Sequence, residues 1–115
     1  MKKIKIKSSF YNYEVINKKI SKDFLLTNSK NVLYLVDKNV YLKNRVINKI
    51  KKNIILIKSN ENSKNYVSIS RILKKILQKN IKRDSVICAI GGGIVQDISG
   101  FIASILFRGI KWNFI

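Results

Sequence analysis

Apolar residues follow two different spacings along this chain of 115 residues, and the two spacings predict alternating strands and helices. Compact apolar runs and strict alternation are typical of strands, whereas apolar positions three and four residues apart are typical of an amphipathic helix. These patterns predict strands at 4–7, 11–16, 32–36, 54–57, 86–90 and 111–115. They predict helices at 22–28, 40–50, 67–77 and 94–105.

The order of these elements predicts an α/β fold. Strands that alternate with helices form crossover units, which build a mainly parallel sheet with helices on both faces. We therefore expect the strands near Val32, Ile54 and Val86 to lie side by side and parallel. The helices expected to cover the two faces are those around Ile47, Ile72 and Ile102.

Three consecutive glycines, Gly91–Gly93, follow the apolar run 86–90 and precede a helical pattern that carries Asp97. A strand that leads through a glycine turn to a helix N-terminus can bind an anion. The backbone N–H groups are exposed there, and no side chain blocks the approach of a phosphate. We expect Gly92 to adopt a positive φ in this turn. The turn therefore predicts a bound nucleotide cofactor.

Two simpler interpretations of the same segment stay open. Residues 86–106 are apolar enough for a membrane span, although the glycines and Asp97 would then lie within the bilayer at a cost. A glycine-rich turn between two core elements, without any ligand, also fits. The triplet lacks the spaced glycines of the dinucleotide fingerprint and the Gly-Lys-Ser/Thr ending of a phosphate loop.

The composition narrows the class of protein. The net charge of +18 suggests a nucleic-acid partner, but the lysines are spread evenly and no basic–aromatic pattern accompanies them. We therefore expect neither a nucleic-acid nor a membrane partner. The chain has no histidine, and its single cysteine, Cys88, falls in an apolar run, so we expect no disulfide and no cysteine metal cluster. Because no signal peptide is recognisable, we expect a cytoplasmic location.

Polar residues follow the ends of three predicted strands. The first is followed by Asp37, the second by Glu61 and Lys64, and the third by Gly91–Gly93 and Asp97. Ligands of parallel sheets bind at the carboxyl ends of the strands, where an acidic residue can accept a hydrogen bond from a ribose hydroxyl. Simpler roles stay open: a helix N-cap for Asp37, a solvated pair for the two loop residues, and an interaction with the helix dipole for Asp97.

Motifs at these positions resemble the N-terminal domain of 3-dehydroquinate synthase. The most specific block is Gly91–Phe101, which reads Gly-Gly-Gly-Ile-Val-Gln-Asp-Ile-Ser-Gly-Phe and is followed by Ala103-Ser104 and Phe107-Arg108-Gly109-Ile110. The segment 36–40 resembles the family's Asp-x-Asn-Val element, and Glu61 and Lys64 have the spacing of its Glu-x-x-Lys cofactor pair. The resemblance implies a Rossmann-like sheet and a partial NAD-binding N-terminal domain at residues 1–115.

By this resemblance the cofactor is NAD, and its contacts are assigned by position. Contacts with adenosine are implied for Asp37, Lys38, Asn39, Glu61 and Lys64. Gly92, Gly93 and Ile94 would line the pyrophosphate, and Asp97 would hold a cofactor hydroxyl. Arg108 would bind the phosphorylated sugar acid substrate across the interface of a homodimer, while a surface Arg near a helix end is its simpler role.

The implied reaction is the NAD-dependent cyclisation of 3-deoxy-arabino-heptulosonate 7-phosphate, with loss of phosphate, to 3-dehydroquinate. This step belongs to the shikimate pathway of aromatic amino acid biosynthesis. The family's divalent metal, zinc or cobalt, is bound by a Glu and two His of a later, helical domain. The sequence ends at Ile115, before that domain, so we expect a partial chain with no metal ligand, no catalytic residue and no cyclase activity of its own.

Alternatives remain beside this resemblance. Gln96 stands where most family members have Gly, which leaves related cyclases of the 2-deoxy-scyllo-inosose synthase type open. A metal-dependent polyol dehydrogenase shares a glycine turn before an Asp, but the element Arg108-Gly109 argues against it. The alternative that is not an enzyme is an inactive vestigial fragment.

Overall fold

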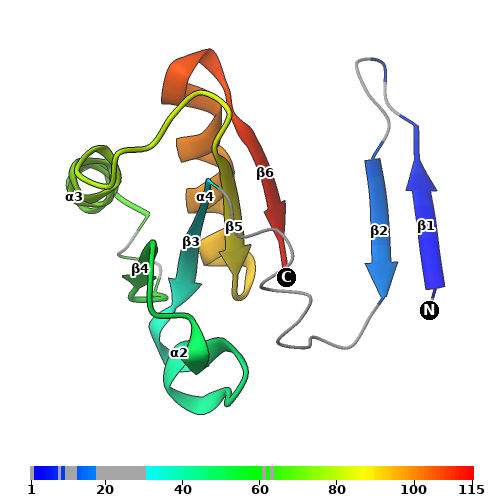
Figure 1. Cartoon of the computed structure of the whole chain (residues 1–115), viewed down its shortest axis with the longest axis horizontal. Helices are drawn as coiled ribbons and strands as arrows, with labels where there is room; N and C mark the ends of the chain where they lie inside the picture. The colour runs from blue at the N-terminus through cyan, green and yellow to red at the C-terminus, as the bar shows by residue number, and fades with distance from the viewer. Residues whose placement is uncertain (1, 8, 10–12, 18–30, 61, 63) are drawn as a thin grey trace.

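The computed structural model of this chain describes residues 2–7, 9, 13–17, 31–60, 62 and 64–115 (Figure 1). Its strands are β1 (Lys2–Ile6), β2 (Tyr13–Asn17), β3 (Val32–Asp37), β4 (Ile54–Ile57), β5 (Val86–Ile90) and β6 (Lys111–Phe114). Its helices are α2 (Lys38–Lys43), α3 (Tyr66–Leu77) and α4 (Gly93–Ile105), with short 3₁₀ turns η1 (Ile47–Lys49) and η3 (Leu106–Arg108). The predicted helix 22–28 and the first two residues of the predicted strand 11–16 lie outside the described residues.

Four of the strands form a parallel sheet in the order β4-β3-β5-β6. β3 and β5 lie at its centre, and every residue of β3 is buried, as expected for a continuous apolar run. β1 and β2 pair antiparallel in a separate two-stranded sheet. The predicted parallel arrangement of the strands near Val32, Ile54 and Val86 is therefore confirmed.

Alternate residues of the two central strands face different hydrophobic clusters. On one face, the odd-numbered apolar residues of β3 and β5 pack with α3 and α4 through side chains such as Ile76 and Ile102. On the other face, the even-numbered residues pack with Tyr41 of α2 and Ile47 of η1. The sheet is thus flanked by helical elements on both faces, as the sequence pattern predicts.

One predicted element is wrong and one alternative is excluded. The segment 40–50 is not a single helix, because Asn44 has an extended backbone and its side-chain oxygen accepts hydrogen bonds from the N–H groups of Val46 and Ile47, at 2.9 and 3.1 Å. Asn often competes with helix formation in this way. A membrane span over 86–106 is excluded, since this segment divides into β5 and α4. Among the helices described here, none is long and apolar enough to cross a bilayer.

The strand order creates a topological switch point between β3 and β5. From β3 the chain passes through α2 to β4 on one side, then crosses back to β5 and continues to β6 on the other. The first connection packs on one face of the sheet and the later two pack on the opposite face. The loops after β3 and β5 therefore diverge, and ligands of open α/β sheets bind in the crevice between such loops.

Candidate functional site

Residues from three loops meet at the carboxyl edge of the parallel sheet. Asp37 ends β3, Lys64 lies between β4 and α3, and Gly91–Gly93 join β5 to α4. In Figure 1 this edge is the lower end of the sheet, next to α2 and the beginning of α4. The loops that the sequence singles out are thus gathered at the switch point.

Gly91 is packed directly against the end of β3. A Cβ atom at this position would lie 2.9 Å from Cβ of Asp37 and 3.1 Å from Cγ2 of Val95, and the φ of Gly91 is +150°. Its N–H donates a hydrogen bond to the carbonyl of Ile115 at 3.2 Å. Glycine suits both the close approach and the backbone angle. The positive φ predicted for Gly92 is wrong, because the turn places that angle at Gly91 and Gly92 has a φ of −82°.

Gly92 and Gly93 face open space instead. Apart from the adjacent residues and the backbone of α4 itself, no atom would lie within 4 Å of a Cβ at either position. Gly92 is the N-cap of α4, whose first hydrogen bond runs from the N–H of Gln96 to the carbonyl of Gly92 at 3.1 Å. The preceding N–H groups have no acceptor within the helix, and the helix dipole adds a partial positive charge. This combination of room and donors fits a pyrophosphate group.

The carboxylate of Asp37 caps α2. Its Oδ1 accepts hydrogen bonds from the N–H groups of Asn39 and Val40, at 2.8 and 3.4 Å, and the residue is only 8% exposed. The structure therefore supports the N-cap role that the sequence leaves open. Lys38 and Asn39, in the first turn of α2, are both exposed at the same edge.

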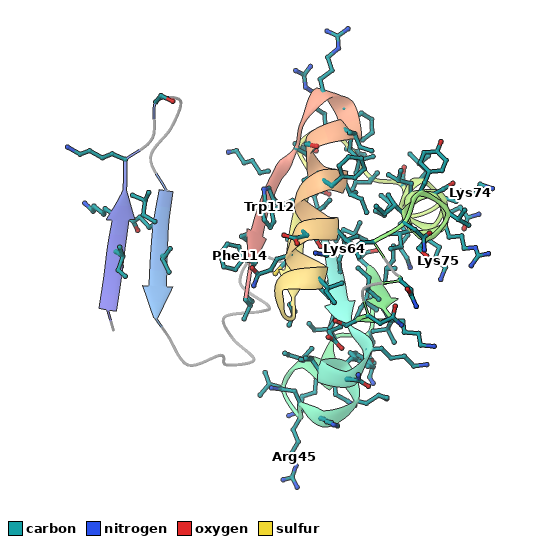
Figure 2. All side chains as sticks on the ribbon, turned by 180° about the vertical axis from the view of Figure 1, so that it is seen from behind. Arg45, Lys64, Lys74, Lys75, Trp112 and Phe114 are labelled. Atoms are coloured by element: carbon teal, nitrogen blue, oxygen red, sulfur yellow. The ribbon has the colours of Figure 1, made fainter. Side chains whose placement is uncertain are left out.

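An ion pair joins the second loop to α4. Nζ of Lys64 lies 2.6 Å from Oδ2 of Asp97. Lys64 stands directly before Asn65, whose side chain caps α3 by accepting a hydrogen bond from the N–H of Ser68 at 2.8 Å. Figure 2 shows Lys64 beside the ribbon of α4. Two residues predicted from separate motifs are therefore in direct contact.

Two predicted site residues are not part of this cluster. Glu61 lies outside the described residues. Arg108 lies beyond the C-terminal end of α4, a helix of 13 residues, and so about 20 Å from the glycine turn. It is exposed and has a φ of +64°, directly after Phe107 with a φ of +48°. The structure does not bring Arg108 to the glycine turn of the same chain.

The sequence prediction names the glycine triplet and Gln96 but misses how Gly91 and Gln96 shape the turn. The positive φ could have been placed at Gly91, because it is the first glycine after the strand, where a tight turn must begin. The Nε2 group of Gln96 donates a hydrogen bond to the carbonyl of Gly91 at 3.4 Å. No known motif signals this contact, since it depends on the backbone path of the turn.

The described residues do not form a site for the divalent metal of the family that the sequence resembles. They contain no group of three or more His, Cys, Asp or Glu side chains that could hold a metal ion, and the whole sequence has no histidine. Burial raises the pKa of the Cys88 thiol from 9.0 to about 11. The thiolate form that binds metals or acts as a nucleophile is therefore disfavoured.

Comparison with known proteins identifies relatives of this chain. A family model described as 3-dehydroquinate synthase N-terminal matches residues 54–115, just over half of the chain. The 3-dehydroquinate synthase of Clostridium kluyveri is 36% identical over 91 residues, which cover 73% of this chain and 25% of that protein. The enzyme of Clostridium tetani is 34% identical over 108 residues, which cover 94% of this chain and 27% of that protein. The chain thus spans about a quarter of the length of these relatives.

The fold has a counterpart among solved structures. A 2-deoxy-scyllo-inosose synthase complexed with carbaglucose-6-phosphate, NAD+ and Co2+ matches with a TM-score of 0.77 and 15% sequence identity. The match covers 99% of this chain and 35% of that synthase, so it shows a shared fold. Because the sequence relatives and the family model agree, the chain belongs to the 3-dehydroquinate synthase family and corresponds to its N-terminal part.

Proposed function

We propose that this chain forms the NAD-binding part of a 3-dehydroquinate synthase. The observation that carries the proposal is the glycine turn at the switch point, where Gly91 packs against Asp37 while Gly92 and Gly93 leave open space before α4. A pyrophosphate in that space would receive N–H donors and the positive end of the helix dipole. The NAD+ in the structure of the inosose synthase, which shares this fold, supports the choice of cofactor.

In this proposal the glycine turn and α4 contact the pyrophosphate and a hydroxyl of NAD, and the two other loops contact its adenosine. Gly92, Gly93 and Ile94 line the pyrophosphate, and Asp97 holds a cofactor hydroxyl. The adenosine is contacted by Asp37, Lys38, Asn39, Glu61 and Lys64. Arg108 binds the substrate phosphate of a partner subunit in a homodimer, since it lies at the opposite end of α4 from the turn of its own chain.

The whole protein would convert 3-deoxy-arabino-heptulosonate 7-phosphate to 3-dehydroquinate in the cytoplasm, with elimination of phosphate. When bound, NAD supplies a hydride acceptor for a transient oxidation that acidifies the neighbouring proton. The described residues of this chain bind and orient the cofactor and supply no metal site. We therefore expect no phosphate release from the heptulosonate phosphate when the purified chain is given NAD and zinc or cobalt. Turnover above a no-enzyme control would contradict this expectation.

The relatives favour this substrate over that of an inosose synthase. The two 3-dehydroquinate synthases are 36% and 34% identical to the chain, whereas the inosose synthase is 15% identical. Gln96 gives no reason to prefer another substrate, because its side chain donates to the carbonyl of Gly91 within the turn.

A titration with NAD tests the proposed cofactor site. Gly92→Val places a branched side chain in the open space, where it would occupy the position of the phosphate. The extended backbone of Gly92 accepts such a residue, so the fold should survive. We expect NAD affinity to fall at least about tenfold, as for the loss of one charge-assisted hydrogen bond or more, while adenosine affinity changes little.

A matched control on the same helix is Ser104→Val, which adds a branched side chain near the end of α4 that lies away from the turn. It should leave NAD affinity unchanged. Equal NAD affinity of Gly92→Val and the unaltered chain would show that the turn does not hold the pyrophosphate. Absence of NAD binding by the unaltered chain would refute the proposed function.

A further inference from the structure

The ion pair between Lys64 and Asp97 lies beside the proposed pyrophosphate turn. Asp97 follows Gly93 by little more than one turn of α4. A carboxylate so near a helix N-terminus offsets part of the positive field there and repels an incoming phosphate. Nζ of Lys64 lies 2.6 Å from Oδ2 of Asp97, so the lysine offsets part of this charge.

Both residues of this ion pair lie next to or within a helix of the fold. Lys64 directly precedes Asn65, the N-cap of α3, and Asp97 belongs to α4. The side chain of Lys64 is 34% exposed and that of Asp97 is 65% exposed. The lysine is thus the more enclosed partner, and the carboxylate remains accessible to a ligand.

We propose that Lys64 is a positioning residue whose effect on phosphate affinity passes through Asp97. The lysine holds Oδ2 of Asp97 and offsets part of the carboxylate's charge next to the turn. This inference rests on the proposed function, because it assumes that the glycine turn takes the pyrophosphate of the cofactor. Without Lys64, Asp97 stands as an uncompensated negative charge near the phosphate. Without either charge, that repulsion is absent.

Inorganic pyrophosphate is the probe that isolates this effect, because it has no hydroxyl for Asp97 and no adenosine for the neighbouring loops. Its affinity is measured at low salt for the full chain and for Lys64→Met, Asp97→Asn and the double variant. Lys64→Met should weaken binding by roughly two- to fivefold, the range of an exposed ion pair. In the Asp97→Asn background the same change should have little effect, and Asp97→Asn alone should strengthen binding.

Two further variants separate this role from general effects of charge and shape. Lys74→Met removes one positive charge from the exposed side of α3, and it should change little in a chain of net charge +18. Figure 2 shows Lys74 on α3, away from Lys64. Lys64→Arg keeps the positive charge and should restore pyrophosphate affinity.

The outcomes distinguish this inference from the proposed function. A loss of equal size for Lys64→Met in both backgrounds would mean that Lys64 acts on the phosphate directly, through its own charge or a contact, and it would overturn the positioning role alone. Weaker binding by Asp97→Asn would overturn it as well. If the unaltered chain binds neither NAD nor pyrophosphate, the proposed function fails together with this inference.

Discussion

Gly91 and Gly92 are neighbours with opposite surroundings, and alanine at each position separates packing from binding. A Cβ at Gly91 would lie 2.9 Å from Cβ of Asp37, and its φ of +150° strains any other residue. Gly91→Ala should therefore lower the free energy of unfolding by roughly 2 kcal/mol, from overpacking and backbone strain. Gly92→Ala meets open space and should cost roughly 1 kcal/mol or less. Urea unfolding of both variants checks this, and equal losses would contradict the structure.

Cys88 predicts a dependence of stability on pH. The thiol has an ordinary pKa of 9.0, which burial raises to about 11 in the folded chain. Between these values the unfolded chain releases the proton and the folded chain keeps it. The contribution of Cys88 is therefore complete below pH 9, and the free energy of unfolding falls as the pH rises from 9 to 11.

Urea unfolding below pH 9 and near pH 11 measures this fall in the unaltered chain and in Cys88→Ala. The variant should lose less stability over that range. Part of the fall should persist in the variant, because burial, the larger of the two causes that raise the pKa of Tyr34, does not depend on Cys88. An identical fall in both chains would show that the thiol is not buried as the structure has it.

At the scale of single residues, the sequence predicts types of role better than exact positions. The glycine triplet identifies the turn, because missing side chains are visible in the sequence. The sequence does not show that Gly91 packs against the end of β3 while Gly92 faces open space, because this difference depends on how closely β3 approaches β5. The hydrogen bond from Gln96 to the carbonyl of Gly91 depends on the same backbone path.

Among the elements, α2 depends most on its cap. It has six residues, which are too few for a stable helix by itself. Oδ1 of Asp37 accepts hydrogen bonds from the N–H groups of Asn39 and Val40. Asp37→Ala should lower the free energy of unfolding by about 1 kcal/mol through loss of this cap. Asp37→Asn keeps the oxygen and should preserve most of the stability. Thermal unfolding of the two variants is the measurement, and equal stability would show that the cap contributes nothing.

The elements themselves are predicted well where burial is continuous or the helical period is long. The run that forms β3 and the amphipathic pattern of α3 both appear where the sequence places them. The failure at 40–50 has a local cause, since the side chain of Asn44 supplies hydrogen bonds that compete with the helix. Spacing of apolar residues cannot reveal such competition.

At the scale of the whole molecule, the site forms because the parallel sheet brings three strand ends to one edge. The sequence predicts this edge, since alternating strands and helices imply a parallel sheet. It does not predict that Lys64 and Asp97 touch, because the contact depends on the path of the loop before α3.

The other end of α4 leads to β6, whose residues are all exposed. They include Trp112 and Phe114, whose ring centroids lie 5.8 Å apart (Figure 2).

The most direct test of the central claim is a titration of the isotope-labelled chain with NAD, followed through its backbone amide signals by NMR. The account predicts the largest shifts at Gly92, Gly93 and Ile94, with further shifts at Asn39 and Lys64. The signal of Arg108, at the far end of α4, should stay unchanged in the monomeric chain. Shifts that centre on the far end of α4, or no shifts at the glycine turn, would contradict the claim that this chain binds NAD there.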